Sequence, residues 1–323
     1  LEGMPAYNID DRVIFKSFLT APKRLREMQR ELCQEIRLYF REHDISVALL
    51  QGNYVGFILA PTRFWSETKL VFCNHGALMN QWKQKDIVFI QLFSSILCHH
   101  VVTLTERNCA DYRKRFFLPG KKVSPIYNWL EDDVACSSEY KKDAKQIISA
   151  GRFGKEKGFD QLIKAFAPVA KRHPDWSLTI FGDGEMLETV KSLVKEFGLE
   201  KQVILPGVCT DLKEQYKNYS MYVLPSYREG LPLVLLEAKA NRLPIVSFDV
   251  LTGPREIIQD KVDGLLVPPE DIPALSQAMN FLIEHPEIRQ AMSDRSQDNL
   301  EKFSKEKILL QWRSLIEDLT SKR

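Results

Sequence analysis

The chain has 323 residues, 44% of them hydrophobic, and a formal net charge of +2 at pH 7. Because this length exceeds what one hydrophobic core usually organises, two domains are expected. The charge is too close to zero to attract nucleic acid in bulk, and no apolar stretch reaches the roughly 20 residues of a membrane-spanning helix, so neither nucleic acid nor a membrane span is expected.

The first half of the chain alternates apolar strands with helical patterns. Strands are predicted at residues 45–50, 69–73 and 101–105, and helices at about 23–43, 55–64, 86–98 and 106–116. This alternation predicts an α/β layer with a parallel sheet. His75 follows the second strand directly. At this point a loop histidine without chemistry and a ligand-binding histidine both remain open.

The second half begins with an apolar strand at 146–150, a loop that contains Arg152 and Lys157, and a helix at about 159–172. Ligands of open parallel sheets bind at the carboxyl ends of the strands. Two cations beside a helix start can neutralise a diphosphate, although a basic loop is most often only hydrated. The loop is therefore a candidate phosphate site.

Glu229 and Glu237 are two carboxylates eight residues apart, one before a predicted helix and one inside it. In a continuous helix this spacing corresponds to roughly 12 Å, well beyond the ~5 Å of a retaining glycosidase pair. The two groups are therefore not expected to act as acid and nucleophile on one bond. Separate binding roles, one for a sugar and one for a ribose, fit the spacing better, although a single Glu at a helix start is most often solvated.

The loop around Glu229 leads from a strand at 221–224 into this helix, with Pro232 expected in its first turn, where a missing amide hydrogen is tolerated. The backbone amides of Gly230 and Leu231 would then point out of the helix start, where the macrodipole favours an anion. The sequence thus predicts a cradle for a phosphorylated sugar.

Two further strands end in glycine-containing loops. One precedes Gly182-Asp183-Gly184, and another, beginning at Val246, precedes Gly253-Pro254. Because the carboxyl ends of parallel strands meet at one edge of a sheet, these loops are expected to converge on one crevice.

The order and spacing of these motifs over residues 147–270 resemble the nucleotide-binding domain of the retaining glycosyltransferases of family four. These enzymes adopt the GT-B fold of two facing Rossmann-like domains. The segments that carry the resemblance are Gly151-Arg152, Lys157-Gly158, Gly182-Asp183-Gly184, Leu205-Pro206-Gly207, Pro225-Ser226, Glu229-Gly230-Leu231-Pro232, Glu237-Ala238, Gly253-Pro254, Glu256-Ile257-Ile258 and Asp263-Gly264-Leu265-Leu266-Val267.

The resemblance implies a role for each matched residue. Arg152 and Lys157 would hold the donor diphosphate, Glu229 the hydroxyls of the donor sugar, and Glu237 those of the ribose. His75 occupies a strand exit where the family has a histidine that contacts the donor sugar. The nucleotide base would lie near Gly207 and Val208. The full set of remaining donor-binding positions would be Gly151, Gly182, Gly207, Val208, Gly230 and Leu231.

The expected fold is therefore α/β with two Rossmann-like domains, at residues 1–145 and 146–323. A final helix at about 305–320 is free to cross back onto the first domain, as it often does in the resembling family. Family members normally begin with a strand, a glycine-rich loop, a helix and a second strand, and this chain starts at Leu1 without that unit. If the unit is truly absent, a partner chain could be needed to complete the acceptor side.

The expected function is transfer of a sugar, with retention at the anomeric carbon, from a nucleotide diphosphate sugar to a glycan or lipid-linked acceptor in cell-surface polysaccharide assembly. UDP is the expected nucleotide by its frequency among such enzymes, and a hexosyl or N-acetylhexosaminyl group the expected sugar. A nucleotide-sugar-binding partner without its own acceptor site is a second interpretation, and a sugar-nucleotide epimerase of the same fold a third.

No cofactor or metal is expected, because cations and helix starts can neutralise the diphosphate. The pair His99-His100 beside Cys98 has no further ligand at helical spacing. A cytoplasmic location is expected, since no secretory signal is visible. Contact with an anionic membrane surface would fit two basic clusters, at Lys23, Arg24, Arg26 and Arg30, and at Arg107, Arg113, Lys114, Arg115, Lys121 and Lys122.

Overall fold

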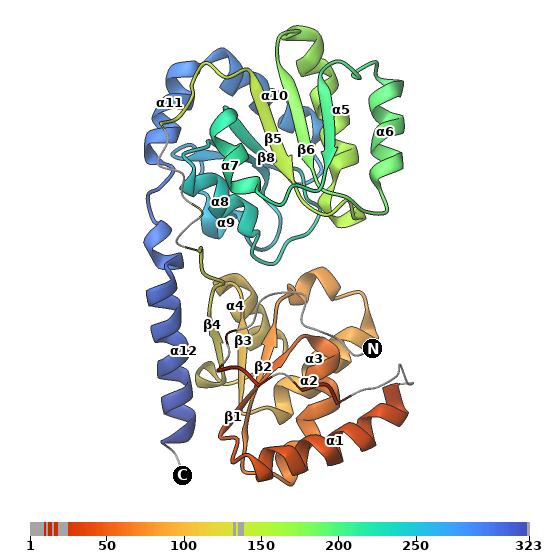
Figure 1. Ribbon diagram of the computed structural model, residues 1–323, viewed down its shortest axis with the longest axis vertical. Coiled ribbons are helices and arrows are strands. Elements are labelled where there is room, and N and C mark those ends of the chain that lie inside the picture. The colour runs from red at the N-terminus through yellow and green to blue at the C-terminus, as the bar shows by residue number, and fades with distance from the viewer. Residues whose placement is uncertain are drawn as a thin grey trace. The chain divides into compact units, whose positions relative to one another are not determined.

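The computed structural model describes residues 10, 12–14, 16–18, 25–131, 134 and 139–321, with the backbone alone for residues 25–28. These residues form two compact units, which Figure 1 shows in ribbon form. The first unit holds the residues up to Thr103, with Asp111–Ser124 and the segment from Arg313. The second holds Leu104–Ala110 and the residues from Pro125 to Trp312. The described residues between Pro125 and the expected boundary near residue 145 thus belong to the second unit.

The first unit is an α/β layer built on a four-stranded sheet in the order β1-β2-β3-β4. The pairs β1·β2 and β2·β3 are both parallel. Its elements are α1 (Leu25–Glu42), β1 (Val47–Gln51), α2 (Asn53–Leu59), η1 (Ala60–Phe64), β2 (Lys69–Asn74), η2 (Leu78–Gln81), α3 (Lys85–Leu97), β3 (His100–Thr103), the part of α4 (Glu106–Arg115) from Asp111, η3 (Gly120–Lys122) and β4 (Val123–Pro125).

The strands and helices predicted in this half are confirmed to within a few residues, with one difference. The expected helix at 55–64 is divided into the α-helix α2 and the 3-10 helix η1. Pro61 lies in the first turn of η1. Because proline has no amide hydrogen and clashes with the preceding turn, it ends an α-helix at this point.

The core of the first unit lies between β2 and the helices that pack on it. Leu70, Val71 and Phe72 are fully buried, as expected of a central parallel strand. A Cβ atom on Gly56 of α2 would lie 2.6 Å from the Phe72 ring. The glycine therefore lets α2 approach the sheet more closely than any larger residue could.

The second unit carries a six-stranded sheet in the order β10-β9-β8-β5-β6-β7, whose pairs are parallel throughout. Its elements are β5 (Gln146–Ala150), η4 (Lys155–Lys157), α5 (Phe159–Arg172), β6 (Ser177–Phe181), α6 (Leu187–Glu196), β7 (Val203–Gly207), α7 (Leu212–Gln215), η5 (Tyr216–Asn218), β8 (Met221–Leu224), α8 (Leu233–Ala240), β9 (Ile245–Phe248), α9 (Pro254–Ile257), β10 (Gly264–Val267), α10 (Ile272–Glu284), α11 (Pro286–Arg295), η6 (Leu300–Phe303) and the part of α12 (Lys305–Thr320) up to Trp312. The rest of α12, from Arg313, belongs to the first unit.

The strand order of this sheet reverses at β5. From β5 the chain moves outward to β6 and β7, and then returns to place β8 on the other side of β5. The loops that follow β5 and β8 therefore leave the same edge of the sheet in opposite directions. In open parallel sheets a crevice forms at such a switch point, and ligands bind there. This topology decides where the candidate site lies.

A buried ion pair joins α8 to the loop that precedes β10. The Lys239 ammonium lies 2.5 Å from the Asp263 carboxylate and also donates to the carbonyl of Ile257 at 3.0 Å. Both side chains are almost fully buried, and this burial raises the pKa of Asp263. Since two charges have been moved out of water, each stabilises the folded protein only while its partner is present.

Lys239→Met is expected to lower the free energy of unfolding by about 3–5 kcal/mol, because it leaves the Asp263 carboxylate buried without a counter-ion. Urea unfolding followed by circular dichroism measures the change. The matched control is Lys191→Met, which removes the exposed partner of Glu188 and is expected to change stability little. Equal stability losses in both variants would contradict the assignment.

Candidate functional site

The loops that follow β5 and β8 touch each other at Gly158, where the loop after β5 enters α5. Gly158 has a φ of +66°, and a Cβ atom added to it would lie 2.1 Å from the carbonyl oxygen of Pro225. No side chain fits at that distance. The glycine therefore permits both the left-handed turn before α5 and the close approach of the loop that carries Glu229.

Lys157 and Glu229, both predicted from the sequence, form the centre of this contact. Lys157 Nζ lies 2.8 Å from Glu229 Oε1, and the two side chains are only 23% and 7% exposed. Ser226 Oγ donates to the same carboxylate oxygen at 2.6 Å. A cation and a carboxylate from opposite sides of the switch point thus share one partly buried position.

A third loop fixes the backbone of Glu229. Thr252, in the loop after β9, donates its hydroxyl to the Glu229 carbonyl oxygen at 2.6 Å. The adjacent Gly253 packs against the same segment, since a Cβ atom there would lie 2.8 Å from the Gly230 carbonyl. Three strand-exit loops, after β5, β8 and β9, therefore hold Glu229 in place, as expected from the convergence of their motifs.

Three of the predicted glycines lie at the ends of neighbouring strands. Gly151 donates its amide to Phe181 O at 3.0 Å, and Gly182 donates its amide to Gly207 O at 2.8 Å. A Cβ atom on Gly182 would lie only 1.9 Å from the carbonyl oxygen of Gly151. The ends of β5 and β6 thus meet backbone to backbone, while a Cβ atom on Gly207 would meet nothing within 4 Å, so open space lies beside the end of β7. Val208, directly after this strand, is 72% exposed.

Arg152 lies in the same loop as Lys157, but its side chain is 73% exposed and bonded to Glu156 at 2.6 Å. The structure therefore places this cation beside the candidate site, on a surface carboxylate, while Lys157 is the cation inside it.

The helix after Glu229 begins one residue later than expected. Pro232 is the N-cap residue of α8, and Leu233 is its first helical residue. The prediction that Pro232 lies in the first turn is therefore wrong by one position. Gly230 and the buried Leu231 precede the cap and belong to the loop. The amides at the helix start proper are those of Leu233 and Val234.

Glu237 is inside α8, as expected, and its carboxylate accepts a hydrogen bond from Tyr216 OH at 2.8 Å. Burial raises the pKa of Glu237, and the Tyr216 hydrogen bond opposes that shift. Tyr216 itself is fully buried in η5. The protein therefore keeps a carboxylate in a position where its charge is costly to maintain.

The sequence analysis assigned no role to Tyr216, Ser226 or Thr252, although Ser226 lies in a segment that carries the family resemblance. Ser226 offered a weak signal, because a hydroxyl three residues before a loop carboxylate often bonds to it. Tyr216 and Thr252 offered none, since each reaches its partner only through the folded sheet.

His75 belongs to the first unit and follows β2 directly, as predicted. It is exposed, and its Nε2 is hydrogen-bonded to Gln51 Oε1 at the end of β1. Enough protein surrounds the ring to lower its pKa, so the neutral imidazole is favoured. A buried polar network lies beside it: Asn74 accepts the Gly76 amide at 2.7 Å, and Gln91 donates to Gln81 at 2.6 Å.

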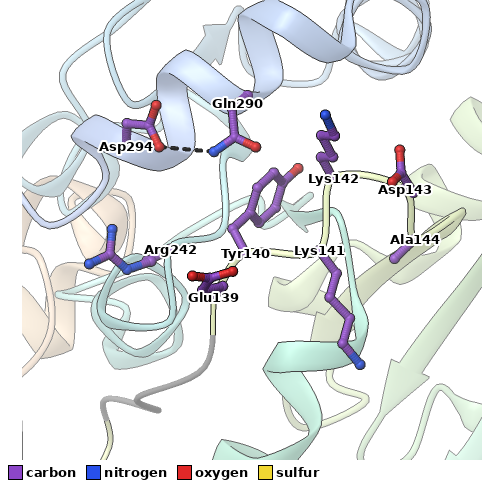
Figure 2. Close-up of a pocket in the computed structure, with 9 residues that line it drawn as sticks. All are labelled: Glu139, Tyr140, Lys141, Lys142, Asp143, Ala144, Arg242, Gln290 and Asp294. Atoms are coloured by element: carbon purple, nitrogen blue, oxygen red, sulfur yellow. Dashed lines mark hydrogen bonds between the residues drawn. The ribbon is translucent and has the colours of Figure 1, made fainter.

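A cavity of about 750 Å³ lies elsewhere in the second unit, between the segment 139–144, Arg242 and α11 (Figure 2). Its lining carries lysines and carboxylates together, and Gln290 donates to Asp294 across one turn of α11. None of the predicted site residues lines it. In the described ranges, no three His, Cys, Asp or Glu side chains gather closely enough to hold a metal ion.

Comparison with known proteins relates this geometry to a family. The profile of glycosyl transferases group 1 matches residues 135–299. A glycosyltransferase of Haemophilus influenzae is 27% identical over 314 residues, which cover 97% of this chain and 88% of the relative. The amylovoran biosynthesis glycosyltransferase AmsD of Erwinia amylovora is 26% identical, with the same shares of each chain covered.

A solved structure shows the same fold. The crystal structure of Anabaena Alr3699/HepE in complex with UDP-glucose matches with a TM-score of 0.79, over 89% of this chain and 82% of that chain. The sequence identity of the pair is 17%, so the likeness concerns the fold.

The burial of Glu237 predicts a pH effect on stability. Its folded-state pKa is raised above 4.5, so the folded protein binds more protons than the unfolded chain just above that pH, and stability is lost as the pH rises. Glu237→Gln keeps an acceptor for Tyr216 and removes the titration. Its stability relative to the native protein is therefore expected to increase as the pH is raised from acid to neutral, in thermal unfolding measured at several pH values.

The control for this measurement has the opposite sign. Lys217 lowers the pKa of Glu214, so Glu214→Gln is expected to lose relative stability as the pH rises. A Glu237→Gln difference that is constant or shrinks with pH would contradict the burial argument.

Proposed function

Because the chain belongs to the glycosyl transferases group 1 family and has the GT-B fold, we propose that it is a retaining glycosyltransferase with a UDP-sugar donor and a glycan or lipid-linked hydroxyl acceptor. The transferred group is a hexosyl or N-acetylhexosaminyl residue. The observation that carries the proposal is the meeting of Lys157 and Glu229, at 2.8 Å, at the switch point of the second sheet.

The two side chains suit the two ends of a nucleotide sugar. Lys157 can bind a phosphate oxygen, and Glu229 can accept hydrogen bonds from sugar hydroxyls. Without a ligand they satisfy each other. A donor that binds here exchanges this ion pair for one contact to its diphosphate and one to its sugar, so neither buried group loses its partner.

Glu237 supports the nucleotide end of the same proposal. A carboxylate is the usual partner of ribose hydroxyls in Rossmann-like sites. The Tyr216 hydrogen bond fixes the Glu237 carboxylate in one orientation before the donor arrives. The base would lie in the open space near Gly207 and Val208, as expected from the family resemblance.

The reaction breaks the bond between the anomeric carbon and the phosphate oxygen and forms one between that carbon and the acceptor oxygen. The acceptor proton passes to the departing phosphate oxygen, and UDP leaves. Negative charge grows on the diphosphate as the first bond breaks, so Lys157 stabilises the transition state more than the bound donor. Lys157 and Arg152 would supply this charge in place of a metal ion.

Relatives support an acceptor from polysaccharide assembly, since AmsD is named for amylovoran biosynthesis. Contact with an anionic membrane, where lipid-linked acceptors lie, would fit the cations Lys114, Lys121 and Lys122 and the 91% exposed Phe117 beside them in sequence. Two residues of the other basic cluster, Lys23 and Arg24, lie outside the described residues. Among the residues that the structure describes, no helix is both long and apolar enough to cross a membrane.

A binding partner without its own acceptor site and a sugar-nucleotide epimerase are the alternatives. A binder would take up a nucleotide sugar and release it unchanged. An epimerase would convert the free donor with no acceptor present. Neither is favoured by a particular contact in the site.

The proposed function is tested with the purified protein, a panel of nucleotide sugars and excess EDTA. The correct donor, present at 100 times its dissociation constant, is expected to stabilise the protein by about 2.7 kcal/mol in thermal unfolding. With an acceptor, transfer should proceed despite EDTA, and proton NMR should show the donor's anomeric configuration in the product. Inversion, a need for metal, or binding without transfer would contradict the corresponding part of the proposal.

Lys157→Ala is expected to lower the transfer rate at least tenfold, which corresponds to about 1.4 kcal/mol of barrier. Lys157→Gln separates catalysis from folding, because it can still donate a hydrogen bond to Glu229 but carries no charge. It should recover stability without recovering the rate. The matched control is Lys155→Ala, an exposed lysine of the same loop, which should retain the native rate. Native turnover in both Lys157 variants would remove Lys157 from the site.

A further inference from the structure

A second cavity, of about 500 Å³, lies in the first unit at the amino ends of its strands. Its lining includes Lys69 at the start of β2 and His100 at the start of β3. His75 follows the carboxyl end of β2, so this cavity is at the opposite edge of the same sheet. A volume of this size is within the range of pockets that hold small molecules.

The charge of the lining is strongly positive. Arg63, Lys69, Lys121 and Lys122 contribute four cations, and Asp318 is the one carboxylate among the lining residues. Within the described part of the chain, none of these four cations forms an ion pair with a carboxylate. The positive charge at this edge is therefore not neutralised by the protein itself.

Two of the cations have a structural explanation. Arg63 Nη1 donates to Leu97 O and Lys122 Nζ to Ile96 O, each at 2.7 Å, so both interact with the last carbonyls of α3. Cations are favoured at a helix C-terminus. Lys69 and Lys121 have no such role, and carbonyl groups leave the net charge of the cavity unchanged.

Two histidines of the lining, His99 and His100, lie within this positive electrostatic field. Burial, together with the surrounding cations, lowers the pKa values of His99 and His100 to about 4, so both rings are neutral at pH 7. His99 Nδ1 accepts the Leu70 amide at 3.0 Å, which leaves the ring proton on Nε2 as a donor. The lining therefore offers hydrogen-bond donors as well as positive charge.

We propose that this cavity binds the phosphate group of a phosphomonoester. Such a group carries close to two negative charges at pH 7 and three acceptor oxygens, which matches a lining of cations and N–H donors. Leu315 and Leu319 of α12 form an apolar part of the wall and can contact the organic portion of the ligand. The same chemistry is found in a soluble phosphorylated metabolite and in the headgroup of a phosphomonoester lipid.

Two probes distinguish these sources. Glycerol 3-phosphate, titrated into the intact protein by calorimetry, tests a soluble ligand. Sedimentation with phosphatidylcholine vesicles, with and without phosphatidic acid, tests a lipid headgroup. Saturable binding of either probe supports the proposal and identifies the source, and binding of neither overturns it. Lys157→Ala is included in the calorimetry, because loss of binding in that variant would assign the ligand to the switch-point site instead.

Substitutions in the cavity test its residues in both directions. Lys69→Gln and Lys121→Gln are each expected to weaken binding roughly tenfold, since each removes one charged hydrogen-bond donor that the fold does not use. Asp318→Asn removes the opposing charge and should tighten binding. Lys83→Gln is the matched control, because this exposed lysine of the first unit lies outside the lining.

Asp318→Asn is therefore expected to bind the phosphomonoester most tightly. The native protein and Lys83→Gln should bind it equally and less tightly, and Lys69→Gln and Lys121→Gln should bind it most weakly. Equal affinities in all five proteins would overturn the proposal.

Discussion

The reversal of strand order at β5 is the constraint on which the candidate site depends. Because β8 returns to the opposite side of β5 from β6, the loops after β5 and β8 leave one edge together. Gly158 then lets these loops touch, and Lys157 and Glu229 meet although 72 residues separate them in sequence. Neither side chain would be a candidate for ligand binding without its partner, because an isolated lysine or glutamate in a loop is normally solvated.

The candidate site contains acidic side chains that are largely buried, where a charged carboxylate is less stable than in water. Glu229 is buried and bonded to a lysine and a serine hydroxyl, while Glu237 is bonded to a tyrosine and its pKa is raised by burial. The buried ion pair of Lys239 and Asp263 joins α8, the helix that carries Glu237, to the residues that lead into β10. Apolar residues in the same positions would stabilise the folded protein about as well as these buried charged groups. The presence of the charged groups therefore fits a site that binds a ligand.

Much of the second half of the chain could be predicted because its signals are local. The strand at 146–150, the helix at 159–172 and the helix at 305–320 were bounded by turn residues and apolar periodicity, and the structure has the same limits. The position of Pro232 was wrong by one residue, since proline is common at the first helical position but here has the extended backbone of an N-cap residue. The contacts of Glu229 with Thr252 and of Glu237 with Tyr216 depend on the folded sheet and left no pattern in the sequence. Ser226, three residues before Glu229, gave only a weak signal.

The central claim is that Lys157 binds the diphosphate and Glu229 the sugar of one donor molecule. The most direct test is to measure by calorimetry how tightly UDP and the UDP-sugar bind to the native protein and to Glu229→Gln. Glu229→Gln frees Lys157 from a competing negative charge and replaces the charged carboxylate that accepts from the sugar hydroxyls with a neutral amide, which is a weaker acceptor. The account predicts that this variant binds UDP at least as tightly as the native protein and loses its preference for the UDP-sugar over UDP. If Glu229→Gln weakened the binding of UDP and of the UDP-sugar by the same factor, or changed the binding of neither, the account would be contradicted.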